Sequence, residues 1–163
     1  MPEEKSPYIQ DYYAENFAWC YGCGRLNPHG LHFKTRWDGE ETVTRYMPRP
    51  EHTAIPGFVY GGLLASLADC HTTGSGALAL HKAAGHLPED GVEAPRCVTA
   101  SLKVDFLKPT PAFTWLEARG RIVEVGARKV VVATEIWADG QVVVRAEGVA
   151  VRVPDAMKGG SSA

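Results

Sequence analysis

The spacing of apolar and polar side chains changes period along the chain, and each change marks a predicted element. Residues 31–37 alternate between apolar and polar, the pair Asp38-Gly39 is typical of a tight turn, and residues 42–47 fit a returning strand. Together they predict a β-hairpin. A proline-rich stretch at 48–56 excludes regular structure there. Residues 61 to about 84 contain no proline and are small and apolar, which predicts one long helix.

The predicted helix has no charged face. Leu63, Leu64, Leu67 and Ala68 cluster on one side, and the other faces carry alanine and serine rather than lysine and glutamate. A helix of this kind is usually enclosed by protein. We therefore expect it to form the centre of the core.

Four long runs of β-type residues follow the helix. They cover residues 98–107, 114–125, 129–138 and 141–153, and Asp139-Gly140 is a second hairpin turn. These runs predict an antiparallel meander of four strands. The fold class is therefore α+β, with a curved antiparallel sheet wrapped round one long central helix. Because such a sheet has open edges, we expect at least a dimer.

Both ends of the chain are predicted to lie outside this core. Ser6-Pro7 is a helix-start pair, and apolar residues between 9 and 17 follow at helical spacing, so we expect a short leading helix in an N-terminal extension of residues 1–16. Residues 154–163 have no apolar periodicity and are expected to form a flexible tail. The length of 163 residues then fits a single domain with its core at about 17–153.

Composition and charge narrow the classes of partner. With 45% hydrophobic and 22% charged residues and a net charge of -2, the chain has the composition of a globular protein and lacks the field that attracts nucleic acid. We find no signal-peptide pattern and no apolar stretch of about 20 residues, so we expect a cytoplasmic protein that binds no membrane. The four cysteines are expected to be free thiols. They are Cys20, Cys23, Cys70 and Cys97.

Three segments carry a further signal. They are Cys20-Tyr-Gly-Cys-Gly-Arg-Leu-Asn-Pro-His-Gly-Leu31, then Tyr60-Gly61-Gly62 with Asp69 nine positions after Tyr60, and then Lys103-Val-Asp-Phe-Leu-Lys-Pro109. In this order and spacing they resemble the hotdog-fold acyl-CoA thioesterases, in particular the PaaI-like branch. The resemblance implies a hotdog fold, coenzyme A thioesters as substrates, and an active site between two protomers of a homodimer or of a dimer of dimers.

The start of the predicted helix can supply the hydrogen-bond donors that stabilise the oxyanion in a thioesterase site. Backbone N–H groups at a helix start lack intrahelical partners, and a glycine lets a substrate carbonyl approach closely. The N–H of Gly61 is therefore the predicted oxyanion donor, with Gly62 in support. Relief of crowding at a tight helix entry is the alternative role of these glycines.

Asp69 is the single carboxylate of the predicted helix. Burying an unpaired carboxylate is costly, so a purely structural role is disfavoured. In the family that the chain resembles, a carboxylate at this spacing acts as general base or as nucleophile, and both remain open here. Thr73 lies on the same face one turn on, where its hydroxyl could hold the attacking water or the carboxylate. A bond back to its own helix is the alternative for Thr73.

One residue departs from the family pattern. Members of the branch usually carry His-Gly-Gly, whereas this chain has Tyr60, so a phenol must fill any role of the histidine ring. The acyl pocket would be lined by Phe58, Val59 and Tyr60, with Phe106 from the meander. Coenzyme A phosphates need a local cationic group, for which Arg128-Lys129 is the strongest candidate. A solvated turn is the alternative for this pair.

Two further residues of the helix are disfavoured as catalysts by their angular positions. His71 is two residues from Asp69 and points roughly 200° away around a helix, so we expect a helix or interface histidine. Cys70 and His71 diverge by about 100° and cannot form a nucleophile–base pair.

Two cysteines and two histidines near the N-terminus are the residue types of a zinc site, but their spacing disfavours one. Cys20-x-x-Cys23 with His29 and His32 would offer four ligands. However, only five residues separate the second cysteine from the first histidine, and His32 falls at the start of a predicted strand. We therefore predict no metal and no redox cofactor.

The sequence thus predicts an acyl-CoA thioesterase and leaves two other functions open. A non-catalytic acyl-CoA binding or sensing protein of the same fold is favoured by the presence of Tyr60. A hydratase or dehydratase of this fold would need an Asp/His pair placed for proton transfer, which the sequence does not assemble.

Overall fold

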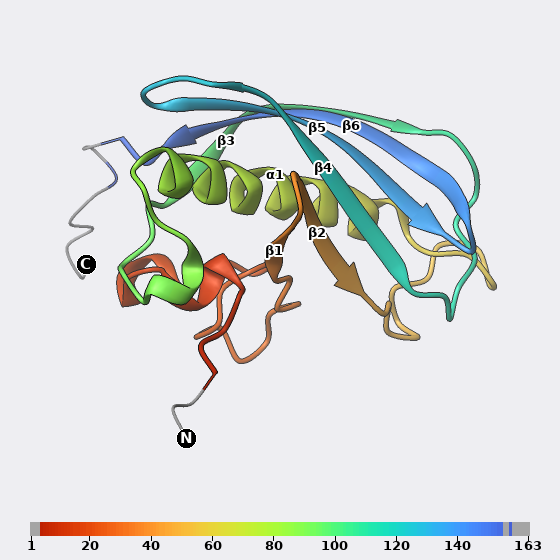
Figure 1. Ribbon diagram of the computed structural model, residues 1–163. Coiled ribbons are helices and arrows are strands. Elements are labelled where there is room, and N and C mark those ends of the chain that lie inside the picture. The colour runs from red at the N-terminus through yellow and green to blue at the C-terminus, as the bar shows by residue number, and fades with distance from the viewer. Residues whose placement is uncertain (1–3, 155–156, 158–163) are drawn as a thin grey trace.

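One long helix lies beneath a curved six-stranded antiparallel sheet (Figure 1). The computed structural model describes residues 4–154 and residue 157. The helix α1 covers Gly61–Ala83, and the strands are β1 (Thr35–Asp38), β2 (Glu41–Tyr46), β3 (Cys97–Phe106), β4 (Leu116–Val125), β5 (Lys129–Ala138) and β6 (Gln141–Arg152). Three short 3-10 helices are η1 (Ile9–Tyr12), η2 (Glu15–Phe17) and η3 (Pro88–Asp90). The arrangement confirms the predicted α+β class and the hotdog fold.

The strand β3 forms one edge of the sheet. The strand order is β1-β2-β4-β5-β6-β3, so the predicted four-strand meander is wrong: only β4, β5 and β6 follow one another, while β3 pairs with β6 and β2 pairs with β4. The loop between β3 and β4 accounts for this order. Its Thr110 carbonyl accepts a hydrogen bond from the Val59 N–H at 2.8 Å, which ties the loop to the chain that enters α1. The chain therefore passes the start of the helix before it joins the sheet beside β2.

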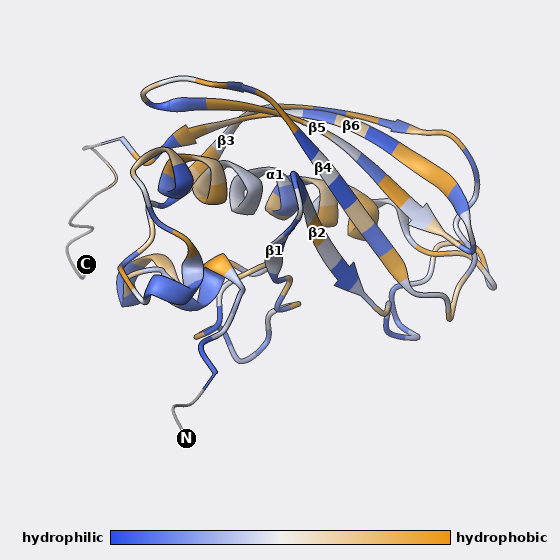
Figure 2. Ribbon diagram, in the orientation of Figure 1, coloured by the Kyte–Doolittle hydropathy of each residue, from blue (hydrophilic) through white to orange (hydrophobic). Residues whose placement is uncertain are grey.

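The second half of α1 is enclosed on all sides. Every residue from Cys70 to His81 is buried, as predicted for a helix without a charged face. The sheet approaches so closely that a Cβ on Gly76 would lie 2.7 Å from the Cβ of Ala150. Hydropathy alternates along the central strands (Figure 2), and on β5 the buried residues recur at every second position. Within the described residues, none of the helices has the length and apolar character that crossing a bilayer requires.

The N-terminal segment covers the side of α1 that faces away from the sheet (Figure 1). Ile9 and Tyr13 are buried there in one cluster with Ala77, Leu78 and Ala94. The predicted single leading helix is wrong, because extended backbone at Tyr13 and Ala14 separates η1 from η2. This break keeps both Ile9 and Tyr13 against α1. The predicted flexible tail of residues 154–163 lies mostly outside the described residues.

The first hairpin is shorter than predicted. β1 begins at Thr35 rather than at residue 31, because the preceding backbone bonds to the cysteine-containing turn. The N–H groups of Leu31 and Phe33 donate to the carbonyls of Tyr21 and Gly22 at 2.8 and 2.9 Å. These hydrogen bonds hold the turn at residues 20–24 against the core.

Candidate active site

The start of α1 presents two backbone donors without protein acceptors. Tyr60 is the N-cap residue and offers no side-chain cap. Within the part of the chain that the structure describes, the N–H groups of Gly61 and Gly62 donate no hydrogen bond to protein. The backbone that precedes the helix is held in place by a hydrogen bond, in which the Tyr60 N–H donates to the His52 carbonyl at 2.9 Å. The amides therefore stand at the positive end of the helix dipole, where a developing oxyanion is stabilised.

The ring of Phe106 lies beside these donors. A Cβ on Gly61 would be 3.5 Å from that ring, which is ordinary van der Waals contact. Phe106 ends the edge strand β3 and is 55% exposed. The aromatic ring thus forms one apolar wall next to the Gly61 amide.

Asp69 is held by a residue that the sequence did not indicate. Its carboxylate accepts a hydrogen bond from the hydroxyl of Thr99 on β3. The pairing of β3 with β6 shifts register between Thr99 and Ser101, which is a β-bulge, and such bulges re-aim side chains at functional sites. Thr99 is one polar residue among several in its strand, so no sequence pattern marks it. Asp69 itself is partly exposed beneath this sheet edge.

Thr73 is on the Asp69 side of α1 but bonds to its own helix. Its side chain is buried, and its hydroxyl donates to the Cys70 carbonyl at 3.1 Å. In this structure Thr73 therefore bonds back to its own helix, which is the alternative to holding the attacking water or the carboxylate. A catalytic role for Thr73 stays a prediction.

Gly61 and Asp69 cannot act on the same thioester within one chain. They are eight residues apart on α1, which corresponds to about 12 Å along the helix axis. An oxyanion donor and a base or nucleophile must both lie within about 3 Å of the reacting carbonyl group. Within one chain these two groups therefore do not form a complete site.

The predicted acyl-binding residues divide into exposed and buried side chains. Phe58 and Tyr60 are exposed, by 42% and 55%, whereas Val59 is 6% exposed and belongs to the main core cluster. The Tyr60 ring folds over Gly62, because a Cβ on Gly62 would lie 2.3 Å from it. Two of the three side chains are therefore accessible in this chain, whereas Val59 is part of the core, and their role in binding an acyl group stays a prediction.

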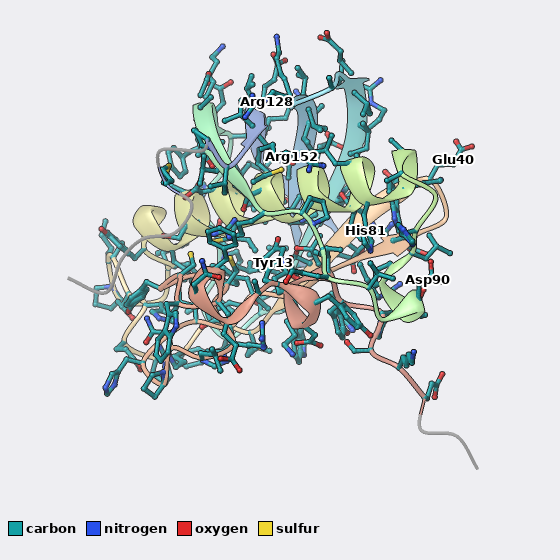
Figure 3. The ribbon with its side chains drawn as sticks, turned by 90° about the vertical axis from the view of Figure 1, so that its left-hand side faces the viewer. Tyr13, Glu40, His81, Asp90, Arg128 and Arg152 are labelled. Carbon is teal, nitrogen blue, oxygen red and sulfur yellow. The ribbon has the colours of Figure 1, made fainter. Side chains whose placement is uncertain are left out.

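The basic pair Arg128 and Lys129 lies far from Gly61 within one chain. Both residues are exposed where the turn between β4 and β5 meets β5, and Arg128 lies on the sheet side of α1 (Figure 3). The adjacent Val130 packs near Gly76 of α1, which is 15 residues after Gly61 and so about 22 Å along the helix. Any contact of this pair with a ligand at Gly61 would have to come from the partner of a dimer.

His71 is a core residue, in agreement with its expected separation from Asp69. Its two ring nitrogens lie 2.7 and 3.1 Å from the hydroxyl oxygens of Thr44 and Thr42 on β2, and Thr42 also bonds Ser75. Full burial lowers the pKa of His71 to about 3. The ring is therefore neutral at physiological pH, with hydroxyls satisfying both nitrogens.

The four candidate zinc ligands do not come together. His29 is exposed, and the ring of His32 is 2.7 Å from the Asn27 carbonyl. Instead, Cys20 and Cys23 meet Cys70 of α1, with all three Sγ atoms within 4.8 Å of one another. All four cysteines are free thiols, as expected.

Comparison with known proteins supplies the chemical context for this geometry. A model of the thioesterase superfamily matches residues 56–145. A thioesterase superfamily protein from Shewanella loihica PV-4 is 44% identical, with a TM-score of 0.64 over 78% of this chain and 96% of that one. No curated protein matches the chain.

Two more distant structures share the fold. The PaaI protein of the E. coli phenylacetic acid degradation operon is 20% identical, with a TM-score of 0.60 over 76% of this chain and 81% of that one. A hypothetical thioesterase from Streptococcus pneumoniae TIGR4, solved with coenzyme A, is 17% identical, with a TM-score of 0.59 over 74% and 88% of the two chains.

Proposed function

Because the chain belongs to the thioesterase superfamily, we propose that it hydrolyses an acyl-CoA thioester to a free acid and coenzyme A. The observation that carries the proposal is Asp69, the one carboxylate of α1, partly exposed beneath the sheet edge and bonded by Thr99. A carboxylate oriented in this way can take a proton from water or attack an acyl carbon. The use of coenzyme A as the thiol is supported by analogy with the Streptococcus pneumoniae relative.

The reacting groups come from two protomers paired through β3. As an edge strand, β3 has one unpaired side that a second copy can extend. If two β3 strands pair antiparallel about an axis near Leu102 and Lys103, Thr99 of one chain lies opposite Phe106 of the other. Since Thr99 bonds Asp69 and Phe106 packs beside Gly61, this register brings Asp69 of one protomer toward Gly61 of its partner. The assembly is thus a homodimer or a dimer of dimers.

In the proposed reaction, the thioester carbonyl oxygen accepts a hydrogen bond from the Gly61 N–H. Asp69 of the other protomer then acts in one of two ways. As a base it removes a proton from water, the hydroxide adds to the carbonyl carbon, and the C–S bond breaks to release the coenzyme A thiolate, which takes up a proton. As a nucleophile its carboxylate oxygen attacks the carbonyl carbon, and the C–S bond breaks to release the coenzyme A thiolate, which takes up a proton. Water then cleaves the resulting acyl-aspartyl anhydride to the free acid and the Asp69 carboxylate. Neither route requires a metal or a redox cofactor.

The acyl group would lie among aromatic side chains. Phe58, Tyr60 and Phe106 are exposed around the start of α1 and offer an apolar surface to a chain or a ring. The pair Arg128 and Lys129, distant in one chain, would serve the coenzyme A phosphates from the partner.

The test is release of free thiol from a panel of short, long and aromatic acyl-CoA thioesters. We expect turnover by the wild type, and a fall in kcat of about 10²- to 10⁴-fold in Asp69→Asn. Glu40→Gln is the matched control, because Glu40 is an exposed carboxylate in the turn between β1 and β2. Normal turnover by Asp69→Asn would refute its role. Rapid acid quench followed by mass spectrometry separates the two routes, since only the nucleophilic one leaves an acyl group on the Asp69 peptide.

One observation favours a second candidate, an acyl-CoA binding protein without turnover. The Tyr60 ring, in place of the histidine of related proteins, covers Gly62 at the helix start. Tight binding of acyl-CoA without thiol release by the wild type would select this candidate, and Tyr60→His would then be the first variant to test for recovered turnover.

A further inference from the structure

Three thiols meet where the N-terminal segment contacts α1. The Sγ atoms of Cys20, Cys23 and Cys70 all lie within 4.8 Å of one another, and those of Cys20 and Cys70 are 3.9 Å apart. Cys23 and Cys70 are buried, and Cys20 is partly exposed. The proposed hydrolysis uses none of these thiols.

The turn that carries Cys20 and Cys23 is shaped to present sulfur atoms. The Gly24 N–H closes it by donating to the Cys20 carbonyl at 2.8 Å. The turn brings the Cys20 and Cys23 sulfurs within 4.8 Å of each other, and the thiolate is the form of cysteine that binds metals.

The third sulfur approaches only because residue 22 is glycine. A Cβ at Gly22 would lie 2.3 Å from the Cys70 Sγ, so any other residue there would push the helix thiol away from the turn. The close contact between the turn and the Cys70 sulfur therefore depends on glycine at position 22.

The distance between the sulfurs of Cys20 and Cys70 matches that of a tetrahedral thiolate site. With metal–sulfur bonds of about 2.3 Å, tetrahedral zinc places its sulfur ligands about 3.8 Å apart, close to the 3.9 Å between Cys20 and Cys70. We propose that Cys20, Cys23 and Cys70 bind one thiophilic divalent cation, Zn²⁺ by its ligand chemistry, which joins the N-terminal turn to α1. This set differs from the Cys-Cys-His-His set that the spacing disfavours.

The surroundings suit a three-thiolate site with an open fourth position. Cys20 lines a cavity of about 300 Å³ together with Asn16, Trp19 and Arg96, through which a water molecule can reach the metal. Three thiolates and a divalent ion leave one net negative charge, and the nearby guanidinium of Arg96 offsets it. Arg96 is itself held over the ring of Tyr13, which lies on the side of α1 away from the sheet (Figure 3).

The test is metal binding by the whole protein, purified under reducing conditions and stripped with a chelator. We expect Co²⁺ to bind at about one equivalent per chain, with a thiolate-to-cobalt charge-transfer band and the strong visible bands of tetrahedral coordination. Zn²⁺ should then displace the cobalt and raise the midpoint of thermal unfolding. Absence of the charge-transfer band in the reduced wild type would overturn the proposal, and this measurement needs no variant.

Variants identify the ligands. Cys70→Ser and Cys20→Ser should each lose the band, with circular dichroism reporting whether the variant is folded. Cys97→Ser is the matched control, because Cys97 is a buried thiol outside the cluster. The double variant His29→Ala with His32→Ala should keep the band; its loss there would assign a Cys-Cys-His-His site instead. If the wild type, exposed to air with Zn²⁺ present, loses two mass units as a disulfide and binds no metal, the cluster is a redox pair and the metal proposal fails.

Discussion

The hydroxyl of Thr99 donates a hydrogen bond to the carboxylate of Asp69, joining the edge strand of the sheet to the central helix. The two residues are 30 positions apart in the sequence. Thr99 lies at a β-bulge, and Asp69 is the only carboxylate on α1. The bond fixes the carboxylate that the proposed reaction needs, and it does so at the edge where a second protomer would pair.

Thr99 is therefore expected to act as a positioning residue. Thr99→Val keeps the branched shape and removes the donor, so we expect kcat to fall by about 10- to 100-fold, as for the loss of a hydrogen bond to a charged group, with KM little changed. Thr99→Ser keeps the hydroxyl and should restore most of the rate. Steady-state thiol release measures both. An equal loss in Val and Ser variants would show that packing matters there rather than the hydrogen bond.

The role of the Gly61 amide can be tested by a proline. Gly61 is the first residue of α1, where proline suits the helix, and Tyr60 before it has the extended backbone that a following proline requires (φ -60, ψ 129). Gly61→Pro removes the N–H while keeping the helical backbone, and we expect kcat to fall by about 10²- to 10³-fold. Gly61→Ala keeps the N–H, and its Cβ makes an ordinary contact with Phe106, so it should retain most activity. Comparable activity of the two variants would contradict the oxyanion role.

A shared site predicts complementation between two inactive variants. Asp69→Asn and Gly61→Pro are each expected to be inactive as homodimers. In a heterodimer of the two, one site carries both substitutions and the other carries neither. Random pairing makes half of the dimers mixed, so co-expressed chains should recover about a quarter of wild-type activity. No recovery in dimers shown to be mixed would place both groups in one chain and contradict the dimer geometry.

His71 makes the protein sensitive to acid. Its pKa is lowered from an ordinary value near 6.5 to about 3 by burial, and it faces Thr42 and Thr44 on β2 and Gly120 on β4, none of them charged. Between these two pH values the unfolded chain binds the proton and the folded chain does not. The free energy of unfolding should therefore fall as pH drops below about 6.5, by at most about 1.4 kcal/mol per pH unit from this group, and be unaffected by it at higher pH.

Urea unfolding of the wild type and of His71→Gln between pH 7.5 and pH 4.5 measures this contribution. Carboxylates act equally in both proteins, so the difference in slope belongs to His71. Parallel slopes in the two proteins would show that His71 does not carry the acid sensitivity.

Local sequence patterns predict most of the elements and the chemistry that they carry. The pattern of residues 61 to about 84 predicts a helix, and α1 covers Gly61–Ala83; the predicted strand at 129–138 coincides with β5. Both patterns are local, since apolar spacing and the absence of proline act within a few turns or a single strand. The same local reading indicated Gly61 at the helix start and Asp69 as the helix carboxylate.

Which of these residues meet follows from the packing of the elements against one another. The partner of Asp69 is Thr99, β3 lies at one edge of the sheet, and the third sulfur beside Cys20 and Cys23 belongs to Cys70. Each of these three features depends on contacts between segments that are tens of residues apart. Such contacts do not change the spacing of apolar residues within either segment, so the sequence pattern does not reveal them. The prediction of a single leading helix is wrong for the same reason. The burial of Ile9 and Tyr13 against α1 outweighed the local helical pattern. Periodicity records which face of an element is buried, whereas the packing of whole elements selects the neighbour that covers it.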